Sequence, residues 1–184
     1  MTAPSFEDFL SLSVDLTAFE ETVLLGTGLA RPYLAKVRAA CGDEVVTALL
    51  DAHRASRADA AVDAGGHDRA LPDRALLDRA LLDRALLDRA LRHQIFSDDR
   101  LGPVARNVIK LWYAGMWFAL PPEWTDCYGA QAAGETSTVT AASYQEGLLW
   151  RAIGANPPGA KAPGYGSWAQ PPRIEDRYLN GATK

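Results

Sequence analysis

LGPVARNVIKLWYAG, residues 101–115, decides the fold class of this chain. Four apolar residues recur in it at the i, i+4, i+7 and i+8 spacing of one helix face: Val104, Val108, Leu111 and Trp112. Asp99 or a neighbour can cap the start, Pro103 fits an early helical position, and Gly115 is placed to end the helix. So wide an apolar stripe predicts a helix packed within a core of other helices.

The residues before this helix also predict helices. SFED (5–8) is typical of a cap for a short helix, and TAFE (17–20) matches a capping box whose helix stops near GTG (26–28). Pro32 fits the first turn of the next helix, and Gly42 is expected to end it. The segment that follows restarts a helix with three residues along one side: Val45, Leu49 and Ala52.

Beyond the central stripe, SYQE (143–146) predicts a second capping box, which opens a helix through GLLWRAI. The residues after this helix are rich in glycine and proline, which prevents a continuous helix. The predicted fold is therefore mostly α, a small helical domain with an extended Gly/Pro-rich C-terminal tail. We expect residues 1–184 to form a single domain.

A pentapeptide repeat, DRALPDRALLDRALLDRALLDRALR, fills Asp68 to Arg92. On a helix each five-residue copy advances by about 140°, so the repeated leucines wind around the cylinder and form no single apolar face. We expect a low-complexity insertion at residues 64–93 that is helical or partly disordered. The alternative is a pentapeptide-repeat β-helix, although five copies form little more than one coil of a fold that needs several.

Composition excludes some classes of protein. The net charge of -4 argues against a nucleic-acid-binding protein, and no apolar run approaches the roughly 18 residues of a membrane span. The N-terminus as written has no signal peptide, so a cytoplasmic location is expected. Cys41 and Cys127 belong to no CxxC motif or His/Cys cluster, which favours two free thiols over a metal site.

A search for catalytic chemistry finds no candidate residue. We expect His53, His67 and His93 to be solvated, because none has a carboxylate or nucleophile at an informative spacing. The phosphate-binding, metalloprotease and hydrolase motifs are missing from the sequence. The sequence therefore predicts no catalytic, cofactor-binding or metal-binding residue, and the chain is expected not to be an enzyme.

The aromatic residues are the most distinctive feature, since all five tryptophans follow the repeat. Trp112, Tyr113 and Tyr144 could simply fill a small helical core. The tail is different, because a segment so rich in Gly and Pro cannot pack on itself yet keeps Tyr165 and Trp168. Large aromatics are typical anchors of protein interfaces, so the tail indicates binding to a partner.

Three motifs in order, ARNVIKLWYAGMW, SYQEGLLWRAI and PPGAKAPGYGSWAQPP, resemble the small subunit of the membrane-bound, FAD-dependent sorbitol, fructose and glucose dehydrogenase complexes. The opening FLSLSVDLT is also similar to that family, whereas Gly147 stands where the family commonly has alanine. The resemblance covers about two thirds of the chain and skips the repeat. It identifies six candidates for contact with a partner: Trp112, Tyr113, Tyr144, Trp150, Tyr165 and Trp168.

This resemblance implies a non-catalytic subunit. Its partner would be a large flavoprotein subunit of the glucose-methanol-choline type, which binds FAD and oxidises a sugar or polyol, often with a cytochrome c subunit. Small subunits of the family help the large one fold and commonly supply a twin-arginine export signal, which this sequence lacks. The complex is thus expected in the cytoplasm, or in the periplasm or at a membrane if the partner carries the signal. A stand-alone helical binding module with the repeat as spacer, and an independent enzyme, remain the alternatives.

Overall fold

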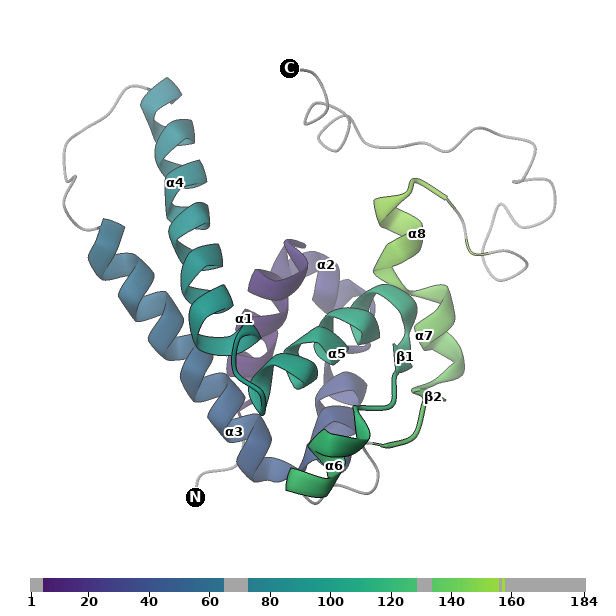
Figure 1. Ribbon diagram of the computed structural model, residues 1–184. Helices are drawn as coiled ribbons and strands as arrows, with labels where there is room; N and C mark the ends of the chain where they lie inside the picture. The colour runs from purple at the N-terminus through teal and green to yellow at the C-terminus, as the bar shows by residue number, and fades with distance from the viewer. Residues whose placement is uncertain (1–4, 65–72, 129–133, 156, 158–184) are drawn as a thin grey trace.

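Helix α5 runs through the middle of the molecule, where α1, α3, η1 and α8 pack against it (Figure 1). The structure is a computed structural model that describes residues 5–64, 73–128, 134–155 and 157. Its helices are α1 (Phe6–Thr17), α2 (Glu21–Gly26), α3 (Ala30–Ala64), α4 (Asp73–Leu91), the π-helix η1 (Arg92–Phe96), α5 (Leu101–Ala114), α6 (Pro122–Tyr128), α7 (Ala141–Gln145) and α8 (Leu148–Ala152). Two short strands, β1 (Met116–Trp117) and β2 (Ser137–Thr138), pair antiparallel. The predicted mostly α fold is confirmed, and the tail from residue 158 lies outside the described residues.

The sequence prediction for α5 is confirmed at both ends and along its stripe. The four stripe residues are at most 1% exposed: Val104, Val108, Leu111 and Trp112. At the start, Asp98 Oδ1 accepts a hydrogen bond from the Leu101 amide at 2.7 Å, so a neighbour of Asp99 supplies the cap. At the end, Gly115 adopts a φ of 71° and its amide donates to the Leu111 carbonyl at 2.9 Å.

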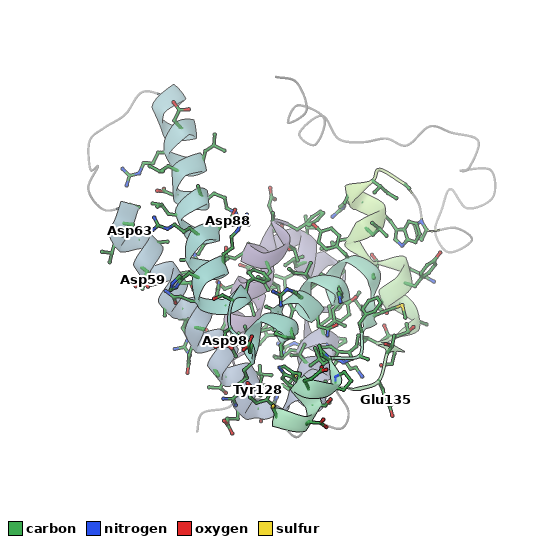
Figure 2. The ribbon with its side chains drawn as sticks, viewed as in Figure 1. Asp59, Asp63, Asp88, Asp98, Tyr128 and Glu135 are labelled. Atoms are coloured by element: carbon green, nitrogen blue, oxygen red, sulfur yellow. The ribbon has the colours of Figure 1, made fainter. Side chains whose placement is uncertain are left out.

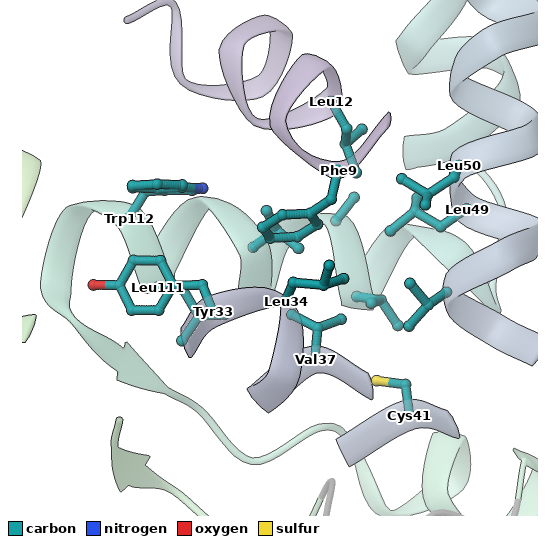
Figure 3. Close-up of a cluster of buried hydrophobic side chains, with 14 of the residues drawn as sticks. Phe9, Leu12, Tyr33, Leu34, Val37, Cys41, Leu49, Leu50, Leu111 and Trp112 are labelled. Carbon is teal, nitrogen blue, oxygen red and sulfur yellow. The ribbon is translucent and has the colours of Figure 1, made fainter. Parts of the chain in front are cut away.

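The core lies where α1, α3 and α5 meet, and Figure 3 shows its side chains interlocking. The ring of Tyr33 on α3 meets that of Trp112 edge-on, with 4.9 Å between centroids. Burial, together with the nearby Glu146 carboxylate, raises the pKa of the Tyr33 hydroxyl. Burial also raises the pKa of the Cys41 thiol to about 12, and Cys41 and Cys127 are both free, as predicted.

The predicted boundaries of the N-terminal helices are partly right. Ser5 caps α1 as expected, since its Oγ accepts a hydrogen bond from the Asp8 amide at 3.3 Å. The prediction of a capping box at 17–20 is wrong. Thr17 is the last residue of α1, and its hydroxyl donates a hydrogen bond to the Ser13 carbonyl at 2.7 Å. Gly42 interrupts α3 with a φ of 79°, and the helix then restarts as predicted.

The capping box predicted at 143–146 is displaced by three residues. Thr140, not Ser143, is the N-cap of α7, and its Oγ accepts a hydrogen bond from the Ser143 amide at 3.1 Å. The Ser143 hydroxyl in return accepts a hydrogen bond from the Thr140 amide, so Ser143 occupies the third helical position of the capping box. The helix predicted through GLLWRAI is a separate element, α8, which begins after Gly147.

The described part of the repeat is helical, and α4 runs back alongside α3 (Figure 1). This confirms the helical interpretation over the β-helix for residues 73–91. The leucines wind around the helix as expected: Leu81 is 63% exposed, whereas Leu91 is 2% exposed. Arg84 Nη2 donates to the Asp15 carbonyl at 2.8 Å, so the end of the predicted insertion (64–93) packs on the core.

None of the helices in the described ranges combines the length and the apolar character needed to cross a bilayer.

Candidate partner interface

Two glycines join the end of α5 to α7 and α8 by close backbone contact. A Cβ atom at Gly115 would lie 2.3 Å from the Ser143 carbonyl oxygen, and a Cβ at Gly147 would lie 2.8 Å from that of Tyr113. Ser143 Oγ donates to the Gly115 carbonyl at 2.8 Å. The position and orientation of α7 and α8 are thus fixed by α5, and an alanine at Gly147 would not fit here.

The outer side of α7 and α8 carries a group of partly exposed apolar side chains. We call it the α7–α8 face: Tyr144 (42% exposed), Leu149 (41%), Ile153 (43%) and the half-buried Trp150. Leu149 and Trp150 lie on α8 and Ile153 is its C-cap, and at helical spacing the three fall within an arc of about 100°. These side chains therefore form one local surface at the side of the molecule where α7 and α8 lie (Figure 1).

The Tyr144 and Trp150 rings hold each other in place on this face. Their centroids are 5.4 Å apart with an interplanar angle of 79°, and Trp150 Nε1 donates to the Tyr144 carbonyl at 2.8 Å. Aromatic pairs of this edge-on geometry add stability beyond their buried area. The two rings are therefore ordered before any partner binds, which lowers the entropic cost of binding.

The other candidates predicted from sequence lie elsewhere. The prediction that Trp112 is an interface residue needs correction, because Trp112 is 1% exposed and fills the core. Tyr113 is half-buried and donates its hydroxyl proton to the Thr17 carbonyl at 3.1 Å, so it ties α5 to α1. Tyr165 and Trp168 lie outside the described residues. Tyr144 and Trp150 are thus the candidates that the structure places together on a surface.

His53 is a second correction, because it is buried rather than solvated. It is 1% exposed, and its Nε2 lies 2.7 Å from Asp15 Oδ2. Arg57 Nη1 donates to the same oxygen at 3.1 Å. Sequence spacing gave no signal for this pair, since Asp15 lies on another helix, 38 residues away. His93 is exposed as predicted, and His67 lies outside the described residues.

The buried pair has the residue types of an acid–base dyad, but its setting favours a structural role. Asp15 is 7% exposed, and the pair lies between α1 and α3 with Arg57 completing it. Buried charged groups are tolerated when they are paired in this way. Within the described residues, no three His, Cys, Asp or Glu side chains come together as a metal site.

No family model, curated protein or solved structure matches this chain. The functional proposal therefore depends on the order of the sequence motifs and on the geometry of the α7–α8 face.

Proposed function

We propose that this chain is a non-catalytic subunit that binds, stabilises and helps mature an FAD-dependent sugar or polyol dehydrogenase of the glucose-methanol-choline type. The observation that carries the proposal is the α7–α8 face, where ordered aromatic and aliphatic side chains remain exposed. A Tyr–Trp pair flanked by aliphatic residues is typical of the centre of a protein interface.

The location of the two motifs that carry the family resemblance supports this proposal. The first motif contains Tyr113 and Gly115, and the second contains Tyr144, Gly147 and Trp150. These segments are about 30 residues apart in sequence, yet they meet through the backbone contacts at the two glycines. The backbone of the first motif thus holds the second motif in place, and the aromatic side chains of the second form a rigid exposed surface.

In the proposed complex the chemistry belongs to the partner. The large subunit would bind FAD and the sugar or polyol, and a cytochrome c subunit would accept the electrons. The present chain would contribute apolar surface that covers a matching patch on the large subunit. Covering such a patch stabilises the folded partner by mass action.

Substitution of Tyr144 by alanine is expected to weaken binding to the large subunit about 30-fold. The change removes an ordered aromatic anchor, which at an interface hot spot contributes about 2 kcal/mol or more. The matched control is Tyr128→Ala on α6, at the bottom of Figure 2. Tyr128 is 37% exposed and its ring also packs against that of a tryptophan, Trp124, so the two variants lose similar contacts within the chain.

The measurement is titration calorimetry of each variant against the purified, FAD-loaded large subunit that is the proposed partner. The proposed interface predicts a weaker affinity for Tyr144→Ala and an unchanged affinity for Tyr128→Ala. Equal affinities for both variants and the unsubstituted chain would remove the α7–α8 face from the interface.

A further inference from the structure

The outer part of α4 exposes leucines that the chain's own core does not use. Near its C-terminal end α4 packs on the core through Leu87 and Leu91. Further out, the helix projects from the body together with the end of α3 (Figure 1), and Leu81 and Leu82 are 63% and 51% exposed. These two neighbouring leucines offer apolar surface that a second molecule could cover.

These leucines belong to one charged and apolar stripe, which we call the α4 face: Asp78, Leu81, Leu82, Ala85 and Arg89. At about 100° per residue, all five fall within an arc of about 100°. The acidic residue stands at the N-terminal end of the stripe, the basic residue at its C-terminal end, and the apolar residues between them. Among the described residues, Asp78 and Arg89 have no salt-bridge partner.

An open hollow of about 580 Å³ continues the α4 face toward η1. Its lining residues are Ala85, Asp88, Arg89, Arg92, His93 and Ser97. Figure 2 labels Asp88 on this part of α4. The small side chain of Ala85 thus leaves space beside a basic end of the helix, where a leucine and a carboxylate from another helix would fit.

We infer that the partner of the α4 face is a second copy of this chain, paired antiparallel along α4. A two-fold axis midway between residues 83 and 84 places Asp78 opposite Arg89 of the other copy, and Leu82 opposite Ala85. Each copy then offers both halves of every contact, as a symmetric dimer interface requires. Two ion pairs flank a leucine-into-alanine contact, which explains why the stripe is acidic at one end and basic at the other.

The expected dimer is weak and independent of the proposed function. The contact is about 16 Å long, from Asp78 to Arg89. A single pair of helices in contact over this length buries less than the roughly 800 Å² per partner of stable complexes. We therefore expect a dissociation constant of about 10–100 µM. Helices α7 and α8 lie across the molecule from α4 (Figure 1), so we expect the dimer to leave the α7–α8 face free to bind the large subunit.

The test is sedimentation velocity of the full chain from about 1 to 200 µM. Asp78→Arg and Arg89→Asp should each weaken the dimer about tenfold or more, because each places like charges opposite one another. The double variant Asp78→Arg/Arg89→Asp should restore dimerisation, because it exchanges the charges and keeps them complementary. Asp83→Arg is the control, since Asp83 is exposed on the same helix but lies about 140° around it from Asp78.

A chain that stays monomeric up to 200 µM would overturn the inference. A double variant that keeps its helical circular dichroism yet fails to dimerise would also overturn it, because charge pairing would then play no part. Loss of binding to the large subunit in the α4 variants, with no change in self-association, would assign the face to that partner instead.

Discussion

Gly115→Ala is expected to lower the free energy of unfolding by about 3–5 kcal/mol and to displace the α7–α8 face. Gly115 has a φ of 71°, where a side chain costs about 1 kcal/mol or more. The larger effect is steric, because the new Cβ would lie 2.3 Å from the Ser143 carbonyl oxygen, which is backbone and cannot turn away. Either α5 or α7 must therefore shift.

Gly28→Ala separates these two effects. Gly28 has nearly the same φ, 70°, but a Cβ there would meet nothing within 4 Å. We expect it to cost only about 1 kcal/mol. Urea denaturation of both variants measures the difference. If Gly115→Ala costs no more than Gly28→Ala, the close contact between α5 and α7 is not present in solution.

Asp15→Ala is expected to lower the free energy of unfolding by about 2–4 kcal/mol. The Asp15 carboxylate accepts a hydrogen bond from Arg57 and lies within hydrogen-bond distance of the His53 ring, which is 1% exposed. Without the carboxylate, a buried imidazole nitrogen loses its partner and stays out of reach of water. Leaving a buried polar group unpaired costs more than the hydrogen bond itself contributes.

Asp51→Ala provides the matched control. Asp51 also pairs with an arginine, Arg54, but both side chains are more than half exposed, so its loss should cost about 1 kcal/mol or less. A cycle of Asp15→Ala, His53→Ala and the double variant, followed by urea denaturation, measures the coupling. Costs that simply add would contradict a direct interaction between Asp15 and His53.

The features that sequence predicted well depend on neighbours along the chain. The stripe of α5, its start near Asp99 and its end at Gly115 all follow from residues within one or two helical turns. The break at Gly42 has the same origin, because glycine alone tolerates that backbone conformation without strain. Local patterns of this kind determine where helices begin and end.

The failures arise where two local patterns compete. At 143–146 two hydroxyl residues, Thr140 and Ser143, could act as the cap, whereas at 17–20 helix α2 begins after Glu20 without a side-chain cap. Thr17 became the end of α1, and Thr140 took the role expected of Ser143. Sequence pattern could not rank these choices, since tertiary packing determines which hydroxyl faces a free amide.

The candidate site was predictable only in part, because exposure depends on contacts between distant segments. Trp112 and Tyr144 looked equally suited to a core or an interface, and packing against Tyr33 buried the first. The pairing of His53 with Asp15 joins two helices and has no sequence signature. The aromatic motifs gave no indication that Gly115 and Gly147 bring the two segments together.

The most direct test of the central claim is expression of the proposed partner, an FAD-dependent dehydrogenase large subunit, with and without this chain. The yield of soluble dehydrogenase and its flavin absorbance per mole of protein are measured in both cases. The proposed function predicts that soluble, FAD-loaded dehydrogenase depends on the chain and that the two proteins copurify. Equal amounts of FAD-loaded dehydrogenase without the chain would contradict it.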